Sequence, residues 1–138
     1  MSIPLDELTI LVLEDSPTAM MDVVLKLRKF INSERIFRAM NYDEAVDILE
    51  QESIQVALLD LSMPKKNGMN LIFDYMKVSP KLNKIPIVVI SGIHDNSLLM
   101  KSIQNTAMEF LSKPVDAEAL EEVLHSISDL IQSDETVK

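Results

Sequence analysis

The stretch Val56-Ala57-Leu58-Leu59-Asp60 decides the fold, because an apolar run of this length leads directly into an acid. A continuous apolar run indicates a strand that is buried on both faces, as in a parallel sheet. Pro64 follows shortly after and prevents a regular continuation. A buried carboxylate is costly unless a partner compensates its charge, and α/β sheets bind their ligands at the carboxyl ends of their strands. Asp60 is therefore the first candidate for a functional residue.

The composition indicates one folded domain. The chain has 138 residues, of which 47% are hydrophobic and 25% charged, which is enough for a single core and too apolar for general disorder. The absence of cysteine excludes a disulfide scaffold and a thiolate metal site. We expect one domain over residues 1–138, with a core of about 8–132 and a polar tail over 133–138.

The charge and the first residues limit the partners. A formal net charge of −9 argues against direct nucleic-acid binding, since phosphate contacts need clustered Lys and Arg. Residues 1–7 lack the basic start and apolar centre of a signal peptide, and no apolar run approaches the ~20 residues of a membrane helix. We expect a cytoplasmic protein without direct contact to nucleic acid or membrane.

Apolar runs and helical patterns alternate along the chain. The runs predict strands over about 8–13, 35–40, 55–60, 85–90 and 109–112. Helices are expected over 18–31, after Asn41, around 71–76, over about 96–105, and from Asp116 to about Ile131. This alternation predicts an α/β fold in which a five-stranded parallel sheet is doubly wound, with helices on both faces. Periodicity does not show which strand lies beside which.

Helix starts are marked by residues that can cap them. Ser16 precedes Pro17, a suitable first helical residue, and Asn41 with Glu44 resembles a capping pair. Asp95 and Asp116 are expected to cap the fourth and the last helix.

Polar residues end four of the five expected strands. They are Glu14 with Asp15, Asp60, Ser91 and Lys113. Since parallel strands end at one edge of the sheet, these groups are expected to meet there. Carboxylates held close together need a cation, and an oxygen-only ligand set suits Mg²⁺. Lys113 adds positive charge and Ser91 a hydroxyl donor, so the edge can receive an anion such as a phosphoryl group.

A carboxylate in this position can itself be the nucleophile and form an acyl phosphate. Asp60 is the favoured acceptor because its strand is central, while the acidic pair after the first strand suits metal binding. Lys113 and Mg²⁺ would neutralise the transferring group, and Ser91 would donate a hydrogen bond to one of its oxygens.

These residues resemble the motifs of a response-regulator receiver domain, the phosphoacceptor half of two-component signalling. The resemblance covers about residues 8–132. The matching residues are Glu14-Asp15, Asp60-Leu61-Ser62-Met63-Pro64 with Gly68, Ser91, and Lys113-Pro114. The resemblance implies a CheY-like fold of the flavodoxin-like type, with the strands in the order 2-1-3-4-5.

The resemblance also implies the roles of the site residues. Asp60 would take a phosphoryl group from a phosphohistidine on a sensor kinase or a phosphotransfer protein. Asp15, Asp60 and the backbone carbonyl of Ser62 would bind Mg²⁺, Glu14 would act through water, and Lys113 would pair with the phosphate. Such a domain is a regulatory phosphoacceptor that assists its own phosphorylation and dephosphorylation, and it is not a conventional enzyme.

Phosphorylation would change a partner-binding face at another place on the surface of the domain. The resemblance implies that the Ser91 hydroxyl would turn toward the phosphate and that the aromatic side chain of Phe110 would swing inward. This change reshapes the face formed by the fourth helix, the fifth strand and the last helix, where family members bind downstream targets, an output domain or a second copy of themselves.

Some positions depart from the common family pattern. Glu14 stands where Asp is frequent, and Ser91 replaces the commoner Thr. Thr106 stands where a glycine often precedes the fifth strand, and Ile93 is apolar where many members are polar. None of these changes removes a required group.

Other classes fit the sequence less well. A haloacid-dehalogenase phosphatase expects a second aspartate two residues after the nucleophile, where this chain has Ser62. A flavodoxin-like electron carrier expects a Ser/Thr/Gly-rich phosphate loop after the first strand. A phosphotransfer protein built around His125 would be all-helical. Two readings within the receiver class stay open: a part of a longer regulator, and a binding module that needs no phosphorylation.

Overall fold

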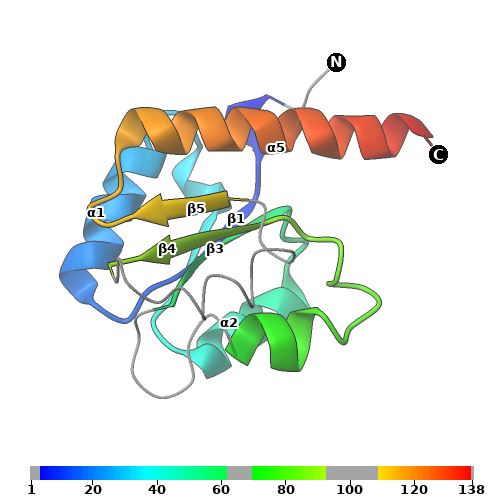
Figure 1. The fold of residues 1–138 in the computed structure, drawn as a ribbon, viewed down its shortest axis with the longest axis horizontal. Coiled ribbons are helices and arrows are strands. Elements are labelled where there is room, and N and C mark those ends of the chain that lie inside the picture. The colour runs from blue at the N-terminus through cyan, green and yellow to red at the C-terminus, as the bar shows by residue number, and fades with distance from the viewer. Residues whose placement is uncertain (1–3, 62–69, 93–108, 138) are drawn as a thin grey trace.

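The strand β3 (Val56–Asp60) lies at the centre of the structure and is buried along its whole length. The computed structural model describes residues 4–61, 70–92 and 109–137 (Figure 1). Five parallel strands form one sheet in the order β2-β1-β3-β4-β5, which confirms the predicted parallel sheet and its strand order. The other strands are β1 (Ile10–Leu13), β2 (Ile36–Ala39), β4 (Ile87–Ser91) and β5 (Glu109–Ser112).

The described helices are η1 (Leu5–Glu7), α1 (Pro17–Leu27), η2 (Ser33–Arg35), α2 (Tyr42–Gln51), η3 (Leu71–Met76) and α5 (Ala117–Val137). The fourth helix expected over about 96–105, with its cap Asp95, lies outside the described residues. The expected third helix is a single wide turn, closed by a 2.8 Å bond from the Lys77 N–H to the Ile72 carbonyl five residues back. The helix α5 continues through Val137, so the polar end predicted as a tail over 133–138 is largely helical.

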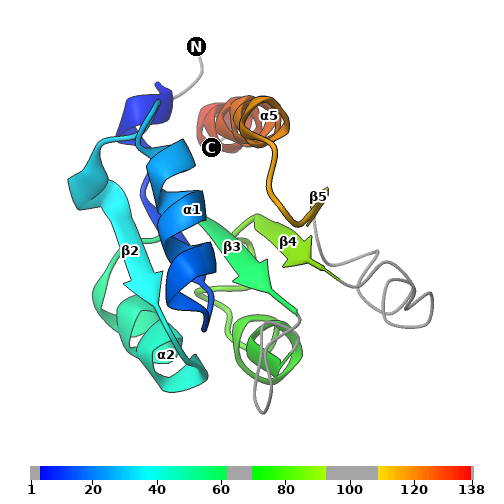
Figure 2. The ribbon, with the colours of Figure 1, turned by 90° about the vertical axis from the view of Figure 1, so that its left-hand side faces the viewer.

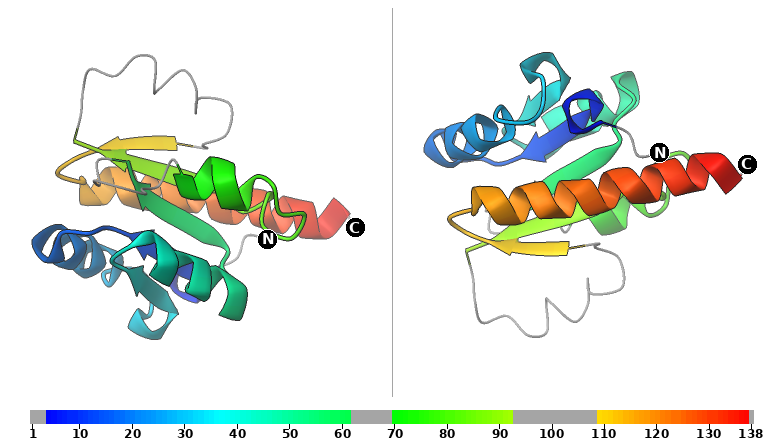
Figure 3. Two further views of the ribbon diagram at one scale, coloured as in Figure 1. Left: turned by 90° about the horizontal axis from the view of Figure 1, so that it is seen from below. Right: turned by 90° about the horizontal axis from the view of Figure 1, so that it is seen from above.

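Two apolar layers cover the sheet, one on each face. Alternate residues of a strand point to opposite faces: in β3, Val56 and Leu58 pack into the layer with α1 and α5, while Ala57 and Leu59 pack into the layer with α2 and η3. Figure 2 shows α1 and α5 on one side of the strands and α2 on the other. The views from below and above show α5 running along one side of the sheet (Figure 3).

Three predicted helix caps are present. The Ser16 hydroxyl accepts from the Ala19 N–H at 3.3 Å and Pro17 begins α1. The Asn41 side chain accepts from the Glu44 N–H at 2.8 Å, and Glu44 reaches back to the Met40 N–H at 2.8 Å. Asp116 accepts from the Ala119 N–H at 2.9 Å at the start of α5. These bonds satisfy N–H groups that have no partner inside a helix.

Candidate functional site

The charged residues of the site continue the rows of apolar side chains that form one face of the sheet. On β1 the row Ile10, Val12 leads to Glu14, and on β3 the row Val56, Leu58 leads to Asp60. Because side chains alternate with a period of two, Glu14 and Asp60 project on the face that carries α1 and α5. The same alternation that places apolar side chains in the core therefore places the two acids at the edge of the sheet.

Lys113 reaches the same place from the far end of the sheet. On β5, Leu111 packs against the α1 and α5 layer, and Lys113 is the next residue in that row. Its backbone N–H donates to the Ser91 carbonyl at 3.1 Å, which continues the β4–β5 pairing past the strand. On β4 the corresponding row ends in Gly92, where an added Cβ would lie 3.7 Å from Lys113 Cδ. The aliphatic stem of Lys113 thus passes over a position without a side chain.

The Lys113 ammonium bridges two buried carboxylates. Its Nζ lies 2.6 Å from Glu14 Oε1 and 3.0 Å from Asp60 Oδ2. Glu14 and Asp60 are 3% and 1% exposed, so neither carboxylate is well solvated. The second oxygen of Glu14 accepts from the Ser16 N–H at 3.1 Å. Charged hydrogen bonds of this kind offset part of the cost of removing an acid from water.

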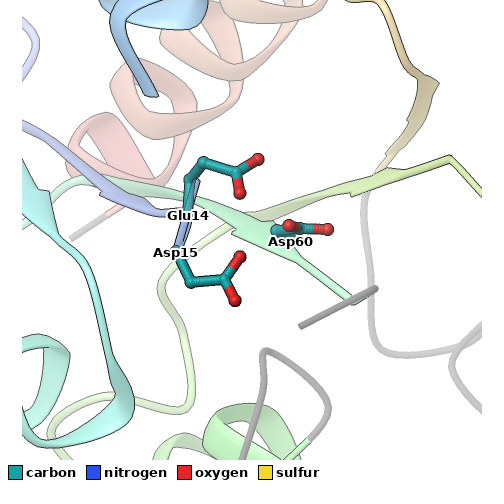
Figure 4. Close-up of side chains that lie close together, drawn as sticks. All are labelled: Glu14, Asp15 and Asp60. Carbon is teal, nitrogen blue, oxygen red and sulfur yellow. The ribbon is translucent and has the colours of Figure 1, made fainter. Parts of the chain in front are cut away.

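Asp15 adds a third carboxylate. One oxygen each from Glu14, Asp15 and Asp60 lies within 4.8 Å of the others, and Asp15 is exposed. Figure 4 shows Glu14 and Asp15 leaving the end of β1 and Asp60 the end of β3, close together. Among the described residues, the site has three carboxylates and one ammonium, and thus an excess of negative charge.

Burial and charge shift two pKa values in the site. The pKa of Glu14 is raised, chiefly by loss of water and also by Asp60, against the lowering effects of Lys113 and the Ser16 N–H. Burial acts to lower the pKa of Lys113, but its bonds to Glu14 and Asp60 outweigh it and the pKa is raised. Lys113 is therefore charged at neutral pH, and Glu14 holds its proton more readily than a free glutamate.

The ligand set fits Mg²⁺. Oxygen atoms on one Mg²⁺ lie about 2.0–2.1 Å from the ion, and thus up to about 4.2 Å from each other. The three carboxylate oxygens lie within 4.8 Å of one another, a spacing that suits direct ligands from Asp15 and Asp60 with Glu14 acting through water. Ser62, whose backbone carbonyl the resemblance adds to the set, lies outside the described residues, as do Thr106 and Ile93.

The two predicted switch residues lie near each other on the opposite face of the sheet. Ser91 is the last residue of β4 and is partly buried. Phe110 pairs in register with Val89 and packs, partly buried, against the layer with α2 and η3. Glu14, Asp15, Asp60 and Lys113 meet directly, whereas Ser91 is placed beside them through the Lys113 backbone.

Sequence reasoning missed the direct bond between Glu14 and Lys113, having assigned Glu14 a water-mediated role. The signal was the extra methylene of Glu where Asp is frequent, which lengthens the reach of this acid. A parallel sheet of this order that ends in an acidic cluster and a lysine is a doubly wound α/β fold with a charged site at the carboxyl ends of its strands. Comparison with known proteins identifies the class to which it belongs.

Residues 10–125 match the response regulator receiver domain family, and the chain belongs to it. Protein PilH of Pseudomonas aeruginosa is 27% identical over 118 residues, which cover 86% of this chain and 95% of PilH. The transcriptional regulatory protein HptR of Staphylococcus aureus is 28% identical over 89 residues, which cover 64% of this chain. The match spans only 33% of HptR.

Solved structures agree in fold. A response regulator receiver domain protein from Clostridium thermocellum superposes with a TM-score of 0.76 at 23% identity, covering 91% of this chain and 97% of that one. The bacteriophytochrome response regulator AtBRR gives a TM-score of 0.73 at 26% identity, covering 88% and 93%. The protein is thus a CheY-like receiver domain of two-component signalling, a regulatory class that interacts with histidine kinases and output targets. None of the described helices has the length and hydrophobicity to cross a bilayer.

Proposed function

We propose that this receiver domain accepts a phosphoryl group on Asp60 from a phosphohistidine of a sensor kinase or a histidine phosphotransfer protein in the cytoplasm. The observation that carries the proposal is the Lys113 ammonium, 3.0 Å from a carboxylate that is 1% exposed at the carboxyl end of the central strand. A buried carboxylate held beside an ammonium places a nucleophilic oxygen and a positive charge together, which suits the transfer of an anionic group.

The transfer is a displacement at phosphorus. A carboxylate oxygen of Asp60 forms the new O–P bond while the N–P bond of the phosphohistidine breaks, and the bonding electrons stay on the imidazole, which takes up a proton. As the carboxylate partner of the Lys113 ammonium, Asp60 attacks without a general base. Lys113 stabilises the charge that spreads over the phosphoryl oxygens. To do so, its ammonium exchanges the bond with Asp60 for one with the phosphoryl group.

Mg²⁺ would be held by Asp15, Asp60 and the Ser62 carbonyl, with Glu14 acting through water, and would neutralise negative charge on the transferring group. The excess of carboxylates over ammonium groups supports this assignment. Glu14 then has two uses: it keeps Lys113 in place through a 2.6 Å bond, and it contributes negative charge for the metal.

The output is a change in partner binding. We propose that the Ser91 hydroxyl turns toward the phosphate and that Phe110 moves inward, which alters the face formed by β5, α5 and the fourth helix expected over about 96–105. A downstream target, an output domain or a second copy of the chain would bind there. The pairing of Phe110 with Val89, two residues before Ser91, supports a joint movement.

The chain can also be the receiver part of a longer regulator, since its match to HptR spans 33% of that protein, whereas the match to PilH spans 95% of PilH. This alternative changes what reads the phosphate and leaves the chemistry at Asp60 unchanged. A binding module that works without phosphorylation is a further alternative, and the ionic contacts of Lys113 argue against it.

The test uses acetyl phosphate as a small phosphodonor with Mg²⁺. Intact-mass analysis should show one added phosphoryl group on the wild-type protein and none on Asp60→Ala. Chelation of the metal should abolish the addition. Equal phosphorylation of the wild type and Asp60→Ala, or none on a folded wild type, would overturn the proposal.

A further inference from the structure

The backbone of Lys113 lies at the end of the sheet that is farthest from the backbone of Glu14. Between β1 and β5 lie β3 and β4, so at about 4.8 Å per strand the two backbones are separated by roughly 14 Å. Within the described part of the chain, β5 is an edge strand that pairs with β4 alone. The sheet alone therefore fixes the position of Lys113 relative to Glu14 through three successive strand pairings.

A second connection does not run through the strands and joins the helix α1 to the segment that follows β5. Lys26, in the last turn of α1, donates from Nζ to the Val115 carbonyl at 2.6 Å. Val115 is two residues after Lys113, and its side chain is 2% exposed within the layer formed with α1 and α5. The chain leaving β5 is therefore fastened to α1 by a charged hydrogen bond and by packing.

The helix α1 is also tied to the acidic end of the site. Ser16 caps α1 through its hydroxyl, and its N–H donates to Glu14 at 3.1 Å. One rigid helix thus contacts both the segment that carries Glu14 and the segment that carries Lys113. Asp22, one turn before Lys26, holds the Lys26 ammonium at 2.8 Å and orients it toward Val115.

We propose that Lys26 is a positioning residue for Lys113: its bond to the Val115 carbonyl keeps the exit of β5 at the distance from α1 that lets Lys113 reach Glu14 and Asp60. The inference extends the proposed function, since it assigns a role in holding the residue that is to meet the phosphoryl group. Among the described residues, the Lys26 ammonium bonds Asp22 and the Val115 carbonyl and none of the three acids of the site.

The variant Lys26→Met keeps the aliphatic stem and removes the ammonium, and Lys26→Arg retains a charged donor. Lys29→Met is the matched control, because Lys29 is exposed on the next turn and its substitution removes the same charge from the same part of the chain. Asp22→Asn removes the orienting carboxylate and should weaken the bond from Lys26 to Val115 without abolishing it.

The decisive reading is the hydrogen exchange of the Lys113 ammonium, measured by NMR in the metal-free protein. An ammonium held by two buried carboxylates exchanges slowly. Lys26→Met should accelerate this exchange at least threefold and leave the amide protection of Val23 and Val24 in α1 within twofold of wild type. Lys29→Met should have no effect, Lys26→Arg should restore slow exchange, and Asp22→Asn should lie between.

The second reading is the rate of Asp60 phosphorylation by acetyl phosphate with Mg²⁺. Lys26→Met should slow it several-fold, and Lys26→Arg should restore it. Unchanged Lys113 exchange in Lys26→Met, or a change that Lys29→Met reproduces, would overturn the role of Lys26. The exchange measurement needs no phosphorylation. A wild-type protein that takes up no phosphate would therefore refute the proposed function, and the exchange measurement would still test the role of Lys26.

Discussion

Leu58 and Asp60 lie two residues apart on β3, point to the same face of the sheet and are both almost fully buried. Leu58 packs among apolar side chains of α1 and α5, and its burial stabilises the fold. Asp60 is buried beside a second acid, and a single ammonium bonds both of them. The body of the strand therefore stabilises the fold, whereas its end holds the buried charge that the proposed phosphoryl transfer would use. Single substitutions can change either the apolar or the charged part of the strand.

The largest effect should come from the apolar side. Leu58→Ala removes a fully buried side chain and leaves a cavity between the sheet and the helices, which should lower the free energy of unfolding by about 3–5 kcal/mol. Urea denaturation followed by circular dichroism measures it. A loss below about 1 kcal/mol would mean that this layer is not tightly packed.

Lys113→Met should destabilise the protein by about 2–4 kcal/mol in the absence of Mg²⁺, because Glu14 and Asp60 stay buried without their cation. Addition of Mg²⁺ should recover part of the loss, since the ion supplies the missing positive charge. A variant as stable as wild type in metal-free buffer would contradict the ionic account of the site.

Asp60→Asn should change the free energy of unfolding in the opposite direction from Lys113→Met, and by a smaller amount. It removes one of two acids that share Lys113, so Glu14 and Lys113 are left as a matched pair. We expect the free energy of unfolding to rise by about 1 kcal/mol without Mg²⁺. A comparable decrease would show that the Asp60 charge is needed for the fold.

The pH dependence of stability should show the effect of the raised pKa of Glu14. Its pKa is raised in the folded state, so the folded protein binds more protons than the unfolded chain between that pKa and about 4.5. As the pH falls through this window, the wild type should gain stability relative to Glu14→Gln. A difference between the two proteins that is independent of pH would contradict the raised pKa.

The smallest effect concerns a surface pair. Tyr75 donates to Glu50, and burial together with this acid raises the Tyr75 pKa to about 12, while the pKa of Tyr42 is also raised above 10.0. Spectrophotometric titration should show little tyrosinate at pH 10, and Glu50→Gln should lower the pKa of Tyr75. Its stability should change by less than about 0.5 kcal/mol, as expected at a surface position. A half-ionised tyrosine near pH 10 in the wild type would contradict this.

The contrast also explains what the sequence could predict. The apolar run ending in Asp60, the Ser16-Pro17 start of α1 and the Asp116 cap are local signals, and each is found in the structure. The strand order came from the family resemblance, because periodicity carries no information on neighbours. Alternation of side chains along each strand places Glu14, Asp60 and Lys113 on one face. This alternation is present in the sequence, but the shared face could be recognised only once the register of the strands was known.

The contacts that set the geometry of the site were not predictable. The bonds of Lys113 with Glu14 and of Lys26 with Val115 join residues 99 and 89 positions apart, and depend on how strands and helices stack. The wide turn at Leu71–Met76 and the short turns at Leu5–Glu7 and Ser33–Arg35 reflect local packing that a helical pattern does not encode.

The most direct test of the central claim is chemical localisation of the phosphoryl group. After treatment with acetyl phosphate and Mg²⁺, borohydride reduces an acyl phosphate of aspartate to homoserine, and peptide mass spectrometry locates the modified residue. We predict homoserine at Asp60, unchanged aspartate at Asp15 and no reduced side chain at Glu14. Reduction at Asp15 instead, with Asp60 unchanged in the folded protein, would contradict the assignment of the buried acid at the end of β3 as the phosphoacceptor.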